Sequence, residues 1–241
     1  MMSSSDPTPF SAEVEALVSE PNTTATRRRN SEVPGLDQSF WEQRWQSVEG
    51  AGKPESVDPN RTLTEVAALL PPGNALDAGC GQGGDAIWLA KHGWEVTAVD
   101  FVSSALRRGR WMAEQSGDSV ANRIVWHQAD LNDWEPERQS FDLVSAHYLH
   151  GVARRADMFA RLAAAVRPRG TLLVVGHHPS SADISGGTMP NAVFFTSADV
   201  TAVLGKQWDV IRTDDDTPRD VVTKDGKTIR LRSSLTQARR R

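Results

Sequence analysis

Cysteine is almost absent from the sequence, and its single example, Cys80, excludes an internal disulfide and any metal site built from several cysteines. No run approaches the ~20 consecutive apolar residues of a membrane helix, so we expect no membrane partner. Residues 1–10 lack a basic segment followed by an apolar one, so we expect no signal peptide and a cytoplasmic protein. An excess of positive charge is also missing: 27 Lys and Arg stand against 31 Asp and Glu. Because domains that bind nucleic-acid backbones are usually basic, we expect no nucleic-acid partner.

The rest of the composition is that of an ordinary globular protein. Of the 241 residues, 39% are hydrophobic and 24% are charged, which excludes a wholly disordered chain, a collagen and a coiled coil. Residues 1–36 are rich in Ser, Thr, Pro and Asn, which predicts a flexible N-terminal tail. We expect one folded domain over residues 37–241, long enough to bury a full core, as a monomer or a homodimer.

From residue 75 onward, short apolar segments alternate with amphipathic ones. Strands are predicted over residues 75–78, 95–99, 124–128, 141–146 and 171–176, and helices over residues 85–92, 103–115 and 157–166. This alternation predicts an α/β fold: a doubly wound, Rossmann-like and mostly parallel sheet with helices on both faces.

Other signals predict the remaining elements. Helices are expected around Trp41 and Trp45, over residues 60–70, and from the capping box at Thr196 to Leu204. Pro168-Arg169-Gly170 predicts a turn before the fifth strand. Two closing strands are expected over residues 207–213 and 233–239, joined by a polar connection that carries the turn signal Asp225-Gly226.

The strongest chemical signal lies between the first of these strands and the helix that follows. Residues 77–84 read Asp-Ala-Gly-Cys-Gly-Gln-Gly-Gly, which fits both the dinucleotide spacing G-x-G-x-x-G and the tighter G-x-G-x-G of Gly79, Gly81 and Gly83. Asp77 favours the second, because its carboxylate would repel a pyrophosphate but suits a cationic ligand such as S-adenosylmethionine. Glycine also permits close approach of the backbone to that ligand. The first spacing leaves a nicotinamide-dependent oxidoreductase as an alternative.

Two further acids end the next two strands. Asp100 ends the second strand, where a carboxylate can accept both ribose hydroxyls of an adenosine. Asp130 ends the third, where it can accept from the adenine amino group while Phe101 and Leu131 sandwich the ring. A strand-end Asp is as often a helix N-cap, so both roles are open for Asp130. Acids at the ends of consecutive strands lie where ligands bind in an open α/β sheet.

These residues resemble the class I S-adenosylmethionine-dependent methyltransferases. The resemblance is carried by residues 77–83, Asp100, Asp130 and the fourth strand at residues 141–144, and it covers residues 37–241. It implies a seven-stranded sheet whose last strand is antiparallel, with S-adenosyl-L-methionine as cofactor. It also implies that the glycine loop with Asp77 holds the methionine end, Asp100 the ribose and Asp130 the adenine.

Other residues extend the resemblance. Ser145, in the fourth strand, joins the expected cofactor-binding set. Phe40-Trp41-x-x-Arg44-Trp45, residues 83–90 and Phe194-Phe195 look similar to the thiopurine and tellurite-resistance methyltransferases.

The methyl-acceptor side is expected where four of the six histidines gather, after the fourth and fifth strands. We predict that His147, His150 and His177 face the acceptor, with His147 or His150 as a general base, since imidazole accepts a proton near neutral pH. The alternative is that these histidines only orient loops. A metal site is not predicted, because no acidic ligand is clearly paired with them.

Missing motifs narrow the acceptor. The family's amino-methylating DNA and RNA enzymes carry (Asp/Asn)-Pro-Pro-(Tyr/Phe) where this chain reads Ser145-Ala146-His147-Tyr148. Enzymes that attack cytosine C5 need a cysteine there, whereas Cys80 lies in the cofactor loop and is expected to be a packing residue. We therefore predict a small-molecule acceptor, with thiol or chalcogen, hydroxyl and amine acceptors all open. A non-catalytic protein that binds S-adenosylmethionine is the second alternative.

Overall fold

The computed structural model describes residues 36–50, 57–150, 152–181, 193–222 and 228–241. The expected tail therefore lies outside the described residues, except for its last residue, Leu36. That residue is buried at 2% exposure and packs with Trp41, so the folded body begins at least one residue before the predicted boundary.

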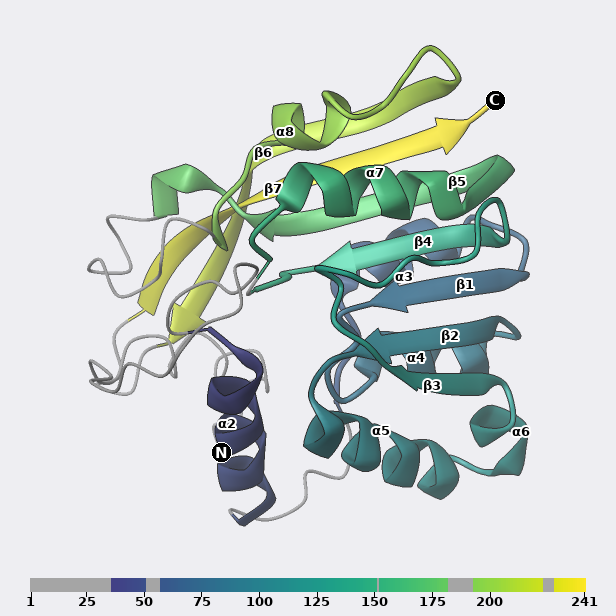
Figure 1. The fold of residues 1–241 in the computed structure, drawn as a ribbon, viewed down its shortest axis with the longest axis vertical. Helices are drawn as coiled ribbons and strands as arrows, with labels where there is room; N and C mark the ends of the chain where they lie inside the picture. The colour runs from purple at the N-terminus through teal and green to yellow at the C-terminus, as the bar shows by residue number, and fades with distance from the viewer. Residues whose placement is uncertain (1–35, 51–56, 151, 182–192, 223–227) are drawn as a thin grey trace, which may run out of the picture.

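A seven-stranded sheet runs through the centre of the molecule (Figure 1). Its strands are β1 (Asn74–Ala78), β2 (Glu95–Asp100), β3 (Ile124–Gln128), β4 (Phe141–His147), β5 (Val166–His177), β6 (Trp208–Val222) and β7 (Thr228–Arg240). They lie in the order β3-β2-β1-β4-β5-β7-β6. Strands β1 to β5 pair in parallel, and β7 is antiparallel to both of its neighbours. The predicted mostly parallel sheet with an antiparallel last strand is confirmed.

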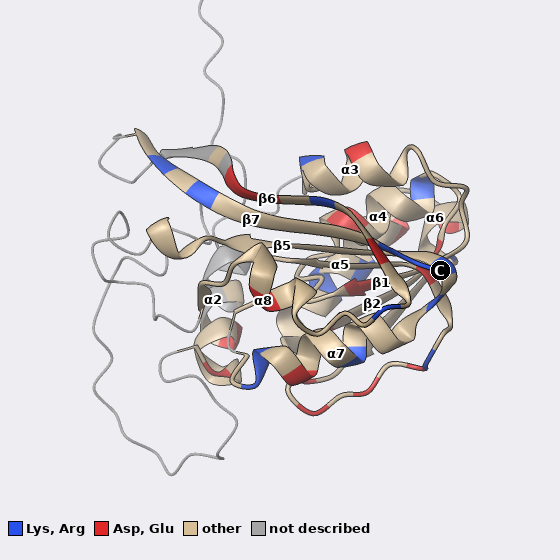
Figure 2. Cartoon of the chain, turned by 90° about the horizontal axis from the view of Figure 1, so that it is seen from above, with Lys and Arg blue, Asp and Glu red and all other residues tan. Residues whose placement is uncertain are grey.

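Helices cover both faces of this sheet, with α3 and α4 on one side and α7 and α8 on the other (Figure 2). The helices are α2 (Gln38–Gly50), α3 (Arg61–Ala67), α4 (Gly84–Lys91), α5 (Ser103–Gln115), α6 (Asp118–Ala121), α7 (Arg155–Ala165) and α8 (Ser197–Thr201), with a 3-10 turn, η1, at Pro179–Ser181. Alternate residues of one strand enter different cores: Ala75 packs with Leu89 of α4, and Leu76 packs with Leu162 of α7. Burial on both faces explains why the central strands read as continuous apolar runs.

Two sequence predictions about strand ends are wrong. Strand β5 begins at Val166 and continues through Pro168 and Gly170, with Arg169 at φ +70° and a register shift opposite Phe141. The predicted turn is thus an irregularity inside a strand, a position where proline is tolerated because no ladder hydrogen bond is lost.

The polar connection predicted over residues 214–232 is mostly strand. Strand β6 runs on to Val222 and β7 begins at Thr228, and only residues 223–227, which hold the predicted turn, lie outside the described residues. The strands escape detection because β6 is an edge strand with much of its surface in solvent. In the part of β6 that was not predicted, Asp216 and Pro218 are both exposed.

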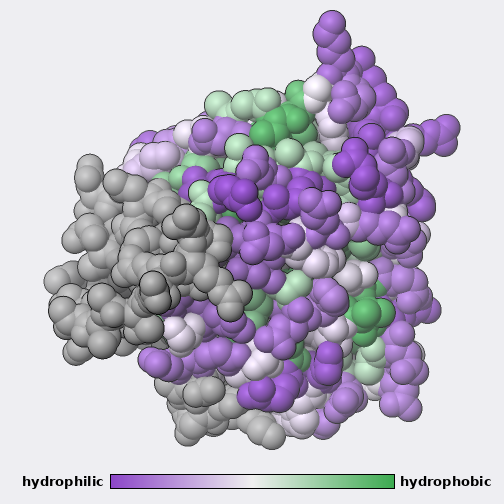
Figure 3. All heavy atoms as spheres, in the orientation of Figure 1, coloured by the Kyte–Doolittle hydropathy of each residue, from purple (hydrophilic) through white to green (hydrophobic). Residues whose placement is uncertain are grey.

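The surface seen in Figure 3 is largely hydrophilic, with hydrophobic residues in small separate patches. Within the part of the chain that the structure describes, every helix is too short or too polar to cross a membrane.

Candidate active site

The loop after β1 needs glycine for conformation and for packing. Gly79, Gly81 and Gly83 have φ values of +74°, +51° and +75°, a region that other residues rarely adopt. A Cβ on Gly79 would clash with Leu149, and one on Gly83 would clash with Trp126. A Cβ on Gly81 would meet only Trp45, at an ordinary contact distance of 3.8 Å, so the described residues leave room for a ligand beside this glycine.

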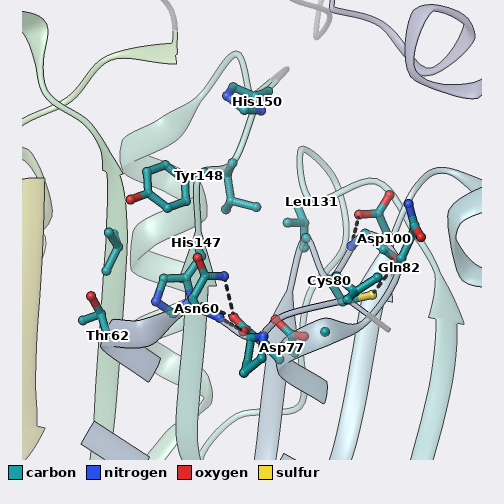
Figure 4. A pocket seen from close by; sticks show the side chains of 18 of the residues that line it. Asn60, Thr62, Asp77, Cys80, Gln82, Asp100, Leu131, His147, Tyr148 and His150 are labelled. Carbon is teal, nitrogen blue, oxygen red and sulfur yellow. Dashed lines mark hydrogen bonds and ion pairs between the residues drawn. The ribbon is translucent and has the colours of Figure 1, made fainter. Parts of the chain in front are cut away.

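A cavity of about 550 Å³ lies at the carboxyl ends of the central strands (Figure 4). This is within the range of roughly 300–1,000 Å³ that small-molecule sites occupy. Its wall contains seven of the predicted cofactor residues: Asp77, Gly79, Gly81, Asp100, Phe101, Asp130 and Leu131. Gly83 and Ser145 are not part of this wall, because Gly83 is the N-cap of α4 and Ser145 is fully buried within β4.

Asp100 is held rigidly at the end of β2. Its two carboxylate oxygens accept hydrogen bonds from the backbone N–H groups of Gly81 (2.9 Å) and Val102 (2.8 Å). Burial raises the pKa of Asp100 to about 6, although these N–H groups favour the charged form. Asp100 therefore links the glycine loop to the start of α5, and its carboxylate is placed at the wall of the cavity.

Asp77 is a buried acid that can still accept a hydrogen bond. Its side chain is only 3% exposed, and its Oδ2 has no hydrogen-bond partner among the described residues. Burial, followed by the charges of Asp85 and Asp100, raises the pKa of Asp77 well above its usual range, and only the backbone N–H of Ala86 opposes this. A cationic group that enters the cavity would remove this cost, so the site fits an ammonium-bearing ligand.

Asp85, on the first turn of α4, was not singled out from the sequence. Its Oδ1 accepts from the backbone N–H of Asn60 (2.6 Å), and its Oδ2 accepts from Nδ2 of Asn60 (2.9 Å). Oδ2 also lies 3.2 Å from Nδ1 of His147, which ends β4. Burial alone would raise the pKa of Asp85, but His147 and Asn60 together hold it below its usual value. These contacts join α3, α4 and β4 at the cavity lining, where Figure 4 shows Asn60 beside His147.

Asp130 is exposed at the rim of the cavity and does not cap a helix, which was one of its two expected roles. Its Oδ1 accepts from the backbone N–H (2.8 Å) and Nδ2 (2.9 Å) of Asn132, so it closes a local turn rather than capping a helix. Asn132 is buried and accepts from the backbone N–H of Ala153. The other oxygen of Asp130 is available to a ligand in the same cavity.

The predicted acceptor histidines have unequal positions. His147 and His150 line the cavity, whereas His177 is 2% exposed and lies behind its wall. The His177 ring packs against those of His150 (centroids 5.5 Å apart) and Tyr148 (5.0 Å), and His150 stacks on Trp41 at 5.4 Å. His177 therefore does not line this cavity, and its ring packs behind those of His150 and Tyr148.

Tyr148 is bent out of the strand direction, with φ +50°, at the end of β4. Its hydroxyl lies 3.1 Å from the hydroxyl of Ser233 on β7, and both residues line the cavity. A positive φ at a bulky residue stores strain and is typical of functional sites. The bend turns the Tyr148 ring toward the cavity side (Figure 4).

Helix α2 is hydrogen-bonded to the residues that follow β2 and contributes two side chains to the cavity lining. Gln38 donates to the carbonyl of Phe101 at 2.8 Å. The carboxylate of Glu42 accepts from the backbone and hydroxyl groups of Ser103 and Ser104, at the N-terminus of α5. The Trp41 and Trp45 rings of the predicted helix line the cavity.

Cys80 lies in the glycine loop and lines the cavity. Burial, followed by the charges of Asp100 and Asp77, raises the pKa of its thiol well above the usual value. A neutral, half-buried thiol is a poor nucleophile. In the described part of the chain, no group of three or more His, Cys, Asp or Glu side chains is arranged to hold a metal ion.

An open α/β sheet with this strand order, a glycine-rich loop after β1 and acids at the ends of β1 and β2 define a class of protein. The fold and the family match over residues 75–170 identify this part of the chain as a methyltransferase domain of the class I kind, whose methyl donor is S-adenosyl-L-methionine. Residues 75–170 match the family described as a methyltransferase domain. This assignment replaces the nicotinamide alternative.

Individual proteins agree with this assignment. An uncharacterized methyltransferase of Mycobacterium tuberculosis is 38% identical over 45% of this chain and 53% of its own length. A ubiquinone biosynthesis O-methyltransferase of Alkalilimnicola ehrlichii is 30% identical over 65% of this chain and 64% of its own length. The chain thus spans between about half and just under two thirds of these curated relatives.

A solved structure, TehB from Haemophilus influenzae, has a TM-score of 0.62 and covers 85% of this chain and 67% of that protein. Its sequence identity is 16%, so it supports the fold alone.

Proposed function

We propose that the protein transfers the methyl group of S-adenosyl-L-methionine to a small-molecule acceptor. The observation that carries the proposal is the continuity of the cavity: one space runs from Asp100 and Leu131, past Asp77, to Tyr148 and His150. A methyl donor and a small acceptor can therefore meet inside one pocket, which supports in-line transfer by positioning.

The cofactor residues act through complementary charge. Asp77 takes the ammonium of the methionine end, Asp100 accepts the ribose hydroxyls, and Asp130 accepts from the adenine amino group beside Phe101 and Leu131. The buried and unpartnered Oδ2 of Asp77 and the placement of Asp100 at the wall support these roles.

The acceptor end has its own wall. Arg212 and Pro218 of β6 and Ser233 and Leu235 of β7 line it, and the hydroxyl of Tyr148 lies 3.1 Å from that of Ser233. Of the predicted bases, His147 and His150 remain candidates because they reach the cavity. A base is needed for a phenol or alcohol acceptor, and far less for a thiol, which supplies some anion at neutral pH.

The test is transfer of labelled methyl groups from S-adenosylmethionine to a panel of thiols, phenols and amines. We expect product with at least one small acceptor, and loss of that product in an Asp77→Asn variant, since the ammonium loses its counter-charge. His92→Gln, at the far and exposed end of α4, is the matched control and should keep the activity.

Two outcomes would contradict the proposal. Methyl transfer only to nucleic acid or protein would overturn the small-molecule acceptor. Tight binding of S-adenosylmethionine without transfer to any acceptor would favour the non-catalytic alternative.

A further inference from the structure

The position of His147 suits a partner for Asp85 better than a base. Both ring nitrogens of His147 are buried, and neither makes a well-formed hydrogen bond within the described residues. Nδ1 nevertheless lies at ion-pair distance from Asp85, and the two side chains are 4% and 6% exposed. A general base has to present an accessible nitrogen to the acceptor's proton. His147 presents Nδ1 to the carboxylate of Asp85 instead, and both residues belong to the cavity lining.

The Asp85–His147 pair lies among other buried carboxylates. Asp77 on β1, Asp85 on α4 and Asp100 on β2 are three buried acids that line the cavity. The other titratable groups of the lining are Asp58, Arg61, Glu65, Cys80, Asp130, Tyr148, His150 and Arg212, besides His147 itself. Buried like charges disfavour each other's ionisation, so an unpartnered Asp85 would compete with Asp77 for charge. Pairing with His147 and Asn60 removes Asp85 from that competition.

Asn60 is the third residue that contacts the carboxylate of Asp85. It is the N-cap of α3, yet its side chain makes no capping hydrogen bond and donates to Asp85 instead. The nearest cation on the same helix, Arg61, is exposed and paired with Glu65, so it does not replace His147. Three elements of the cavity wall thus converge on one carboxylate.

We propose that Asp85, His147 and Asn60 form a positioning set that fixes the glycine loop against β4 and reserves Asp77 for the ammonium of S-adenosylmethionine. His147 is then a positioning residue, and His150 is the remaining candidate for the base. The inference rests on the proposed function for its cofactor but not for its acceptor, which is unidentified.

The test compares Asp85→Asn, His147→Gln and the double variant by calorimetric binding of S-adenosylhomocysteine at pH 7, with thermal unfolding of each variant. Each single substitution leaves a buried polar partner unpaired, so we expect binding about tenfold weaker. The double variant removes both partners, so its loss should be clearly smaller than the product of the two single losses. His92→Gln is the matched histidine control and should bind as the wild type does.

Other results would overturn the proposal. A base acts on the acceptor only, so His147→Gln with unchanged S-adenosylhomocysteine affinity would restore His147 as the base candidate. Losses that simply multiply in the double variant would show that the residues act independently. If a single variant fails to fold, Asn60→Ala provides the second measurement: it should weaken binding several-fold, and unchanged binding would refute the set. Failure of methyl transfer alone would count against the proposed function and leave this result standing.

Discussion

Asp100 makes cofactor affinity depend on pH. Its pKa is raised to about 6 by burial, and the ionised form is the better acceptor for two hydroxyl groups. Protonation below pH 6 should therefore weaken binding. Between pH 7 and pH 5 we expect wild-type affinity for S-adenosylhomocysteine to fall about tenfold more than that of Asp100→Asn, as follows from one proton with this pKa.

Calorimetric titrations at pH 5, 6 and 7 measure this difference directly. The variant is its own control for other groups, including Asp77, that titrate in both proteins. Parallel pH profiles for wild type and variant would mean that Asp100 does not touch the ribose.

His150 should matter only for acceptors that arrive protonated. With a phenol or alcohol, His150→Ala should lower the single-turnover rate by ~10²–10⁴ and abolish its dependence on pH near neutrality. With a thiol of pKa about 8.5 the loss should be small. Rapid-quench measurement of methyl transfer at several pH values separates the two cases, and equal losses for both acceptor types would indicate a positioning role.

At the residue scale, the sequence predicted site residues where an acidic residue stands at the end of a predicted strand. Asp77 and Asp100 were predicted to lie at the cavity, and they do. Asp85 was not, because an acid in the first turn of a helix is ordinary on helix-dipole grounds and gives no sign of a partner. His147 lies 62 residues away along the chain, so only the folded sheet brings the pair together.

At the scale of elements, Glu42 is the main polar link between α2 and α5. Its carboxylate accepts the backbone N–H and hydroxyl groups of Ser103 and Ser104, as an N-terminal capping acid does. We expect Glu42→Ala to lower the free energy of unfolding by about 1–2 kcal/mol, the usual cost of losing a cap. Urea unfolding measures the change, with Glu114→Ala, an exposed acid at the other end of α5, as the control.

The same substitution should also weaken binding of S-adenosylhomocysteine, because α2 carries Trp41 and Trp45 to the cavity wall. Unchanged affinity together with lower stability would show that α2 supports the fold without shaping the site.

Strands β1 to β4 were predicted to within a residue or two of their observed ends. For the central strands β1, β2 and β4 the reason is burial on both faces, because such strands must be apolar. Strand β3 is an edge strand whose Val125 is 65% exposed, and it was predictable through its β-branched and aromatic residues instead. The far parts of β6 and β7 were not, because strand pairing that leaves side chains in solvent imposes no hydrophobic pattern. The helix predicted over residues 60–70 ends early at Ala67, and Leu69 beyond it is 85% exposed.

For the molecule as a whole, a cofactor that binds only the folded state must stabilise it. At a concentration 100 times the dissociation constant, S-adenosylhomocysteine should add about 2.7 kcal/mol. For a domain of this size we expect a rise in Tm of roughly 5–10 °C. Differential scanning fluorimetry should show no such shift with NAD at the same concentration, and the reverse pattern would contradict the assignment of the glycine loop.

The position of β7 between β5 and β6 affects the order in which strands can pair during synthesis. Strand β6 is synthesised first, yet in the sheet it pairs only with β7, so it must wait for residues 228–240 before it can join. The half of the sheet that holds the cofactor loop has all its neighbours much earlier. A ribosome that stalls before residue 228 would therefore hold a nascent chain whose glycine loop and first strands can pair, whereas the β7 part of the cavity lining, including Ser233, is still missing.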